Sequence, residues 1–207
     1  MKEKELLRLT EMKKIEEEFY EKKIELIGGI DEAGRGPLAG PVVVACVIMP
    51  KDSMIEGVNE VSEKKREKLY EEITKTAISY EVGIIDQKEI DNINILNATK
   101  LGLTIAIKGL KVKPEFILVD ALTNIDTCKI PYRSIVKGDA KCYCIACASI
   151  IAKVTRDRIM RQWAEVYPQY GFEKHKGYGT AMHIQAIKEY GLCPLHRHSF
   201  VKNILKG

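Results

Sequence analysis

The sequence predicts an α/β protein in which helices cover both faces of a sheet. Short apolar runs bounded by glycine, proline or charged residues are typical of buried strands. Other segments repeat apolar residues at steps of three or four, as helices packed on a sheet do. Two strands come first and strands then alternate with helices, an order that favours layers. The 207 residues suffice for one core, and we expect a single domain over residues 1–207.

The N-terminal part predicts one helix followed by two strands. In residues 1–22 apolar side chains recur at helical spacing between lysines and glutamates. Residues 24–31 form an apolar run that predicts the first strand. Residues 41–49 begin at one proline and stop before another, and their apolar character predicts a buried second strand. The glycines between the two strands predict a tight return, and the polar stretch 51–61 is irregular.

The middle of the chain predicts, in order, a helix over 62–77, a strand over 80–85, a short helix, a helix over 94–110 and a strand over 116–120. Asp86 and Glu89 form a capping-box pattern for the short helix. Gly102 weakens the helix that follows, and Pro114 stops it.

The C-terminal part predicts one short strand and then helices. Residues 132–136 suit a strand, and residues 141–167 form the longest helical stretch, which ends before a proline. Residues 180–190 predict one more helix, closed by a glycine. We expect residues from about 168 to 207 to form a small helical part.

Charge and hydropathy restrict the function classes only loosely. The net charge of +4 permits nucleic-acid binding without arguing strongly for it. The longest apolar run, 42–49, is too short to cross a bilayer, and the charged N-terminus has no apolar signal core. We therefore expect a cytoplasmic protein without membrane association, and a monomer.

Four acidic residues carry the strongest chemical signal. Asp31 and Glu32 end the first apolar run, Asp120 ends the run 116–120, and Asp139 follows the run 134–138. Acids gathered at one edge of a sheet repel each other unless a cation lies among them. Carboxylate oxygens favour Mg²⁺ or Mn²⁺. We predict that these four residues are metal ligands and catalytic residues of a metal-dependent nuclease.

Each acid also has a plainer interpretation. Asp31 and Glu32 would face opposite sides of a regular strand, so sharing a cation requires the backbone to rotate at the strand end. Asp120 suits an ordinary strand terminator. Asp139 could be the N-cap of the long helix, a role compatible with metal binding. Asp157 sits four residues from both Lys153 and Arg161, which predicts an ordinary ion-pair ladder.

A glycine turn and a tyrosine indicate where a nucleic acid would bind. Gly34-Arg35-Gly36 directly follows the first acid pair, so its N–H groups and guanidinium could approach a phosphate or sugar. Tyr178 lies among lysines and glycines, a setting that suits stacking on a base or sugar as well as a solvated loop. The histidines carry no predicted catalytic role.

Six cysteines raise the question of a zinc site. Cys142, Cys144 and Cys147 lie close together, and Cys193 precedes two histidines. One spacing is Cys-x-Cys rather than the usual Cys-x-x-Cys, and the segment reads as a helix of small buried residues. We therefore favour packing over structural zinc, and we expect no disulfides in a cytosolic chain.

The sequence resembles the bacterial ribonuclease HII family, a type 2 ribonuclease H, over most of its length. The matching blocks, in chain order, are Gly29 to Pro41, Val119 to Leu122, Lys137 to Ala140, Ala148 to Asp157, His175 to Thr180 and Pro194 to Arg197. The resemblance implies a ribonuclease H-like mixed sheet flanked by helices, with the helical C-terminal part near the substrate groove. It implies cleavage of RNA in RNA/DNA hybrids and at single ribonucleotides in duplex DNA, as in ribonucleotide excision repair.

The resemblance also implies roles for particular residues. The family's four acids correspond to Asp31, Glu32, Asp120 and Asp139, which would hold two Mg²⁺ or Mn²⁺ ions. The expected substrate-binding residues are Gly34, Arg35, Gly36, Tyr178 and Lys153. The glycine turn and the tyrosine would read the ribonucleotide 2′-OH, the group that distinguishes RNA from DNA.

One departure from the family and two rival functions remain open. The family carries an Asp-Ser-Lys-Lys-Leu-Ser segment where residues 57–62 are shorter and lack the lysines, which would weaken substrate affinity. A junction resolvase or exonuclease could share the acids, but it would cut all-DNA substrates. A non-catalytic nucleic-acid binder would gain nothing from clustered carboxylates.

Overall fold

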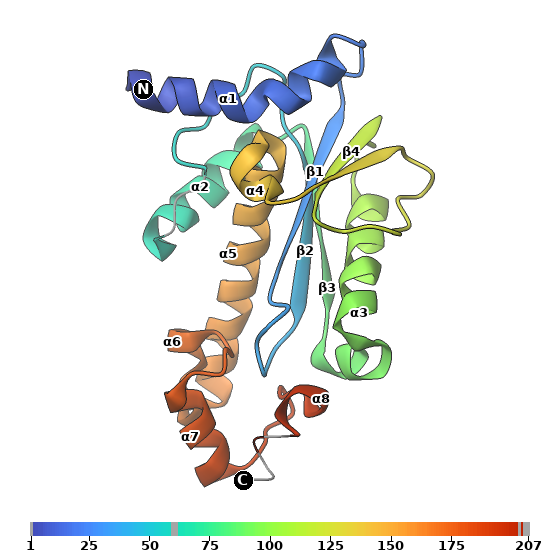
Figure 1. Ribbon diagram of the computed structural model, residues 1–207. Helices are drawn as coiled ribbons and strands as arrows, with labels where there is room; N and C mark the ends of the chain where they lie inside the picture. The colour runs from blue at the N-terminus through green and yellow to red at the C-terminus, as the bar shows by residue number, and fades with distance from the viewer. Residues whose placement is uncertain (1, 59–61, 203, 205–207) are drawn as a thin grey trace.

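One mixed sheet organises the molecule, and the computed structural model describes residues 2–58, 62–202 and 204 (Figure 1). The strands are β1 (Ile27–Ala33), β2 (Val42–Ile48), β3 (Ser79–Ile85), β4 (Phe116–Asp120) and β5 (Tyr132–Ile135), in the order β3-β2-β1-β4-β5. β2 is antiparallel to β1 and β3, whereas β4 is parallel to β1 and β5. The mixed sheet expected from the resemblance is confirmed.

The helices are α1 (Glu3–Tyr20), α2 (Glu63–Thr76), α3 (Gln87–Gly109), α4 (Gly138–Lys141), α5 (Tyr143–Val166), α6 (Phe172–His175), α7 (Ala181–Tyr190) and α8 (His198–Val201), with a 3-10 turn at Pro168–Tyr170. α5 covers one face of the sheet and α3 covers the other (Figure 1). The predicted two-sided arrangement is therefore confirmed.

The interior strand β2, between β3 and β1, explains why both faces are covered. Its seven residues are all buried, and their side chains alternate between the two faces. Val43, Ala45 and Val47 pack in the cluster that contains α5, while Val44 and Cys46 pack in the cluster that contains α3. A strand buried on both sides needs apolar residues at every position, which is why the run shows no polar alternation.

A close approach between α3 and β3 accounts for a glycine inside a helix. A Cβ atom built on Gly83 would lie 1.9 Å from the carbonyl oxygen of Gly102. Glycine at both positions lets the helix backbone lie directly on the strand. Asn94 has φ 67° and ψ 164° and interrupts α3, so the two helices predicted on either side of this residue are confirmed.

Two predicted boundaries are wrong near the acids. β1 continues to Ala33, so Asp31 and Glu32 lie inside the strand rather than at its end. The predicted helix over 141–167 is divided, because Cys142 has extended backbone between α4 and α5. The loop at 57–62, which the sequence predicts to be shorter than in the family, includes residues 59–61, which lie outside the described residues.

The C-terminal helices gather at the end of α5 that lies away from α1 (Figure 1). Their apolar cluster includes Phe172, Ile187 and Leu195 and also contains Ala39 and Met160. The chain after β1 therefore passes directly against the C-terminal part. No helix in the described ranges has the length and apolarity needed to cross a membrane.

Candidate active site

β1 places the first two acids on opposite faces of the sheet. Asp31 pairs with Ala45, whose side chain packs under α5, and Glu32 pairs with Val44 on the α3 side. The backbone does not rotate at this pair, because the ladder to β2 holds both residues, so a shared cation would have to be reached by their side chains. Glu32 instead bends toward the following turn, where its Oε1 lies 3.2 Å from Nη1 of Arg35.

The next parallel strand brings the third and fourth acids to the same region. Asp120 is the last residue of β4, which lies beside β1. Its Oδ1 accepts a hydrogen bond from the N–H of Gly138 at 2.7 Å, and this bond ties the strand end to α4. Asp139 lies within α4, and the N-cap of α5 is Cys142, so the N-cap interpretation of Asp139 is wrong.

Burial and mutual repulsion favour the neutral forms of the first pair. Burial raises the pKa of Asp31 to about 7; the charge of Glu32 adds to the rise, while a hydrogen bond from Ser149 opposes it. Burial also raises the pKa of Glu32, against the pull of Arg35 and with a contribution from Asp120. These acids therefore act on one another, and a cation among them would relieve both the burial and the repulsion.

The donor set fits a hard divalent cation. Oε2 of Glu32 is buried and has no hydrogen-bond partner among the described residues, so it is available as a ligand. All four acids offer carboxylate oxygens, which Mg²⁺ and Mn²⁺ prefer. Across the described ranges, these acids do not bring three ligand atoms within 4.8 Å of one another. Binding would therefore require side-chain rotation.

Lys153 lies between the acids and the neighbouring groove. Its Nζ donates to Oγ of Ser149 at 2.7 Å and lies 4.0 Å from Oδ2 of Asp139. Ser149 in turn hydrogen-bonds Asp31. An ammonium group in this position partly neutralises the carboxylates and can also meet a phosphate.

Two buried arginines hold the loop that follows β1, residues 34–41, here called the glycine loop. Arg156 donates to the carbonyl oxygens of Pro41 at 2.9 Å and Ala39 at 3.1 Å. Arg197, which is fully buried, donates to the carbonyl oxygens of Gly34, Arg35 and Gly40.

Gly34 is required by this arrangement. It has φ +95°, and a Cβ atom there would lie 2.1 Å from Nε of Arg156. Hydrogen bonds from the two arginines hold the carbonyl oxygens of the glycine loop in place. The loop therefore has its shape before any substrate binds.

Tyr178 stands at the edge of the glycine loop. The tyrosine is half-exposed, and a Cβ atom on Gly36 would lie 3.8 Å from its ring. The N–H of Leu38 donates to the carbonyl oxygen of Gly177 at 2.8 Å and holds the two segments together. The structure therefore brings Gly34, Gly36 and Tyr178 into one surface, although they are far apart in the sequence.

A groove rich in cations adjoins this surface. Its volume is about 380 Å³, and it is lined by Ala33, Gly34, Glu63, Arg66, Lys153, Arg156, Asp157, Lys174, His175, Lys176 and Tyr178. The lining includes five lysines or arginines and two acids. Such a surface is suited to a polyanion, and it contains three of the predicted substrate-binding residues.

Other sequence predictions have mixed outcomes. Asp86 caps α3 as predicted, because its Oδ1 accepts the N–H of Glu89 at 2.8 Å. The ladder predicted for Asp157 is wrong, because its Oδ2 lies 3.2 Å from Arg66 Nη2 on α2. α2 packs beside α5 and supplies partners that a single helix cannot show.

The six cysteines are free, as expected, and Cys193 belongs to a different apolar cluster from Cys142 and Cys144.

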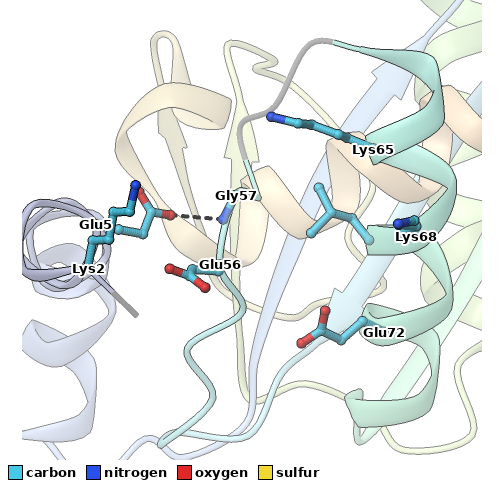
Figure 2. A pocket seen from close by; sticks show the side chains of 8 residues that line it. Lys2, Glu5, Glu56, Gly57, Lys65, Lys68 and Glu72 are labelled. Atoms are coloured by element: carbon cyan, nitrogen blue, oxygen red, sulfur yellow. Dashed lines mark hydrogen bonds between the residues drawn. The ribbon is translucent and has the colours of Figure 1, made fainter.

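Another hollow, of about 430 Å³, lies between α1 and α2 (Figure 2). Lys2, Glu5, Glu56, Gly57, Lys65, Lys68, Leu69 and Glu72 line it. The N–H of Gly57 donates to Oε1 of Glu5 at 2.8 Å (Figure 2). Three lysines are balanced by three glutamates, so this hollow lacks the excess of positive charge seen in the cationic groove.

Comparisons with known proteins place the chain in a family. The family model described as Ribonuclease HII matches residues 28–203. The chain is 56% identical over 206 residues to Ribonuclease HII of Acetivibrio thermocellus, covering 98% of this chain and 80% of that protein. It is 55% identical over 208 residues to Ribonuclease HII of Caldanaerobacter subterraneus subsp. tengcongensis, covering 99% and 86%.

A solved structure extends the likeness to the fold. Ribonuclease H2 from Pyrococcus horikoshii superposes with a TM-score of 0.73 at 27% identity, covering 87% of this chain and 97% of that one. The family model matches most of the chain, and the curated relatives span nearly all of it. The chain therefore belongs to the ribonuclease HII family, whose members are metal-dependent endoribonucleases.

Proposed function

We propose that this ribonuclease H cuts the RNA strand of RNA/DNA hybrids and also cuts duplex DNA on the 5′ side of a single embedded ribonucleotide. The observation that carries the proposal is the joining of three features in one region. The acids of β1, β4 and α4 lie beside a pre-shaped glycine loop, and both adjoin the cationic groove. A polyanion held in that groove would present a phosphodiester to the acids.

The four acids Asp31, Glu32, Asp120 and Asp139 would hold two divalent cations, Mg²⁺ or Mn²⁺. Such cations supply an activated water and stabilise the leaving oxygen of a phosphodiester. Asp31, at the centre of the sheet, is the proposed bridging ligand. Lys153 balances the negative charge of the acids and positions Ser149 against Asp31. The products would carry 5′-phosphate and 3′-hydroxyl ends.

The glycine loop and Tyr178 would recognise the ribonucleotide. Arg156 and Arg197 donate to carbonyl oxygens of the glycine loop, and the N–H groups of Leu38 and Gly40 donate to other carbonyl oxygens. The N–H groups of Gly34 and Gly36 would approach the sugar and phosphate, together with the Arg35 guanidinium once it turns from Glu32. Tyr178 would stack on the sugar or base next to the 2′-OH. We include in this proposal that the enzyme acts as a cytoplasmic monomer of one domain.

The direct test is cleavage of three labelled duplexes of the same sequence during a Mg²⁺ titration. One is an RNA/DNA hybrid, one contains a single ribonucleotide and one is all DNA. Cleavage of the first two, with the single-ribonucleotide duplex cut 5′ of the ribonucleotide, supports the proposal. Cleavage of the all-DNA duplex, branched or with free ends, would favour the resolvase or exonuclease alternative. Binding without cleavage at every Mg²⁺ concentration would favour a non-catalytic binder.

Tyr178→Ala is expected to lower cleavage at a single ribonucleotide by roughly ten- to a hundredfold, because stacking contributes about 1–3 kcal/mol. Tyr190→Ala is a matched control, since both tyrosines are about half-exposed and Tyr190 lies on α7. Initial rates and melting temperatures should be measured for both variants. Equal rates for Tyr178→Ala and the parent would exclude the stacking role.

Metal binding is expected to strengthen as the pH rises through 7. The pKa of Asp31 is raised to about 7, so a proton competes with the cation below that value. The half-saturating Mg²⁺ concentration should fall about tenfold between pH 6 and pH 8, as the deprotonated fraction of Asp31 grows. Rates measured over a Mg²⁺ series at each pH check this expectation. A half-saturating concentration that does not change with pH would show that Asp31 is already ionised at pH 6.

A further inference from the structure

A buried cluster of one carboxyl and two thiols lies outside the proposed active site. Glu16 comes from α1, Cys142 joins α4 to α5, and Cys144 begins α5. Their ligand atoms lie within 4.8 Å of one another. None of the three is more than 1% exposed.

The contacts within this cluster are specific. The N–H of Cys144 donates to Oε1 of Glu16 at 2.8 Å, and the Cys142 thiol donates to the same oxygen at 3.5 Å. The two sulfur atoms are 3.5 Å apart. Apolar side chains surround the group, including Phe19 and Ile145. One carboxyl therefore faces two sulfurs inside an apolar cluster.

Packing accounts for the cysteines but not for Glu16. A buried thiol behaves as a small apolar side chain, whereas a buried carboxyl costs free energy unless it is paired. Capping the N-terminus of α5 needs only a neutral oxygen, which glutamine would supply equally well. A carboxylate and two adjacent thiolates, in contrast, are all ligand types that zinc sites use.

We propose that Glu16, Cys142 and Cys144 bind one thiophilic divalent cation, Zn²⁺, at a structural site. Zinc–sulfur bonds of about 2.3 Å in a tetrahedron place two sulfurs roughly 3.8 Å apart, close to the separation in this cluster. Cys147 lies one turn further along α5 and is fully buried, but its sulfur is outside the group of ligand atoms within 4.8 Å of one another, so it would have to rotate to supply a fourth thiolate. Lys13, also on α1, offsets the negative charge of such a site because its charge acts on Glu16.

This site goes beyond the proposed nuclease function and is independent of it. A bound cation would join α1 to Cys142, which lies three residues after Asp139, and to the first turn of α5. Because the unfolded chain has no preformed site, binding would stabilise the fold. Failure of the zinc proposal would leave the nuclease proposal intact, since the two use different residues.

The test uses the reduced full-length protein carrying Asp31→Asn, which weakens zinc binding by the acids of the proposed active site, in excess Mg²⁺. Zinc content is measured by mass spectrometry after gel filtration, and Co²⁺ serves as an optical probe. We expect about one zinc per chain, a higher melting temperature with Zn²⁺, and a near-ultraviolet sulfur-to-cobalt charge-transfer band. Less than stoichiometric zinc together with no charge-transfer band would overturn the proposal.

Three variants assign the ligands. Glu16→Gln keeps an acceptor for the Cys144 N–H, so the fold should persist while zinc affinity falls at least tenfold. Cys144→Ser and Cys142→Ser should lose the charge-transfer band. Cys46→Ser is the matched control, because Cys46 is also fully buried but lies on the α3 face. Unchanged zinc binding by folded Glu16→Gln and Cys144→Ser would contradict the assignment.

Discussion

Asp31→Asn is expected to lower cleavage of a duplex with one ribonucleotide by at least about a thousandfold, while binding of that duplex largely persists. The reason is that a bridging ligand contributes several kcal/mol to cation-assisted transition-state stabilisation. Asparagine has nearly the same shape as aspartate but lacks its charge. Single-turnover cleavage and fluorescence anisotropy with the same labelled duplex separate the two effects.

The same substitution is expected to stabilise the metal-free protein at pH 8. The pKa of Asp31 is raised from its ordinary value of 3.8 to about 7 by burial, so ionising this group destabilises the fold as pH rises between those values. Removing the charge should increase the free energy of unfolding by on the order of 1–4 kcal/mol. Denaturant unfolding at pH 5 and pH 8 in chelator checks this, and the gain should be larger at pH 8.

Asp86→Asn is the matched control for both measurements. Asp86 also follows a strand, but its side chain only caps α3, and asparagine caps helices as well as aspartate does. Its cleavage rate and unfolding free energy should stay close to those of the parent. Normal turnover by purified Asp31→Asn would remove this residue from the catalytic set.

Arg197→Met is expected to have the second largest effect, because it removes three hydrogen bonds to the glycine loop. Leaving the buried carbonyl oxygens without donors should cost roughly 3–5 kcal/mol. At about 2–4 °C per kcal/mol for a chain of this size, the melting temperature should fall by roughly 6–20 °C. Calorimetry gives this shift directly.

The loss of shape in the glycine loop should also be visible in the enzyme's kinetics. At a temperature where Arg197→Met is fully folded, we expect the cleavage rate at a single ribonucleotide to fall more than binding to the all-DNA duplex. Arg197→Lys keeps the charge but not the planar fork of donors, so it should rescue only part of both losses.

Arg133→Ala is the control for removing an arginine. Arg133 forms an exposed ion pair with Glu18 at 2.9 Å, a contact that contributes little to stability. Its melting temperature and cleavage rate should stay near those of the parent. If Arg197→Met matched Arg133→Ala in both measurements, the proposed support of the glycine loop would be wrong.

The spacing of apolar residues predicts most of the strands and helices, because nearly every buried element carries the periodicity of its type. The run that forms β4 was bounded correctly at both ends, since a buried strand between Pro114 and the loop after Asp120 leaves little freedom. The interruption of α3 at Asn94 was also visible, because the capping pattern at Asp86 predicted a separate short helix.

The pairing of β1 with β2 could not be read from the sequence near Asp31 and Glu32. Glycines at 34 and 36 indicate a turn but not where the ladder ends, and register depends on the partner strand. The partner of Asp157 was missed for a similar reason. Spacing along α5 predicts Lys153 and Arg161 as ion-pair partners of Asp157. In the structure α2 packs against α5 and brings Arg66 to Asp157 instead.

The buried arginines are the part of the candidate site that the sequence predicts least. Arginine is mostly exposed in proteins, so a sequence pattern gives no reason to bury Arg156 or Arg197. Their role depends on contacts across more than 100 residues, between the glycine loop and the C-terminal half. The same holds for Glu16 on α1, whose contact with Cys144 at the start of α5 also spans more than 100 residues.

Crystals soaked in Mn²⁺ test the central claim most directly, because anomalous scattering locates the ion without reference to activity. We expect two anomalous peaks among the carboxylate oxygens of Asp31, Glu32, Asp120 and Asp139, as two-cation hydrolysis requires. Carboxylates that stay apart, with no anomalous peak between them at saturating Mn²⁺, would contradict the claim that these acids form a paired metal site.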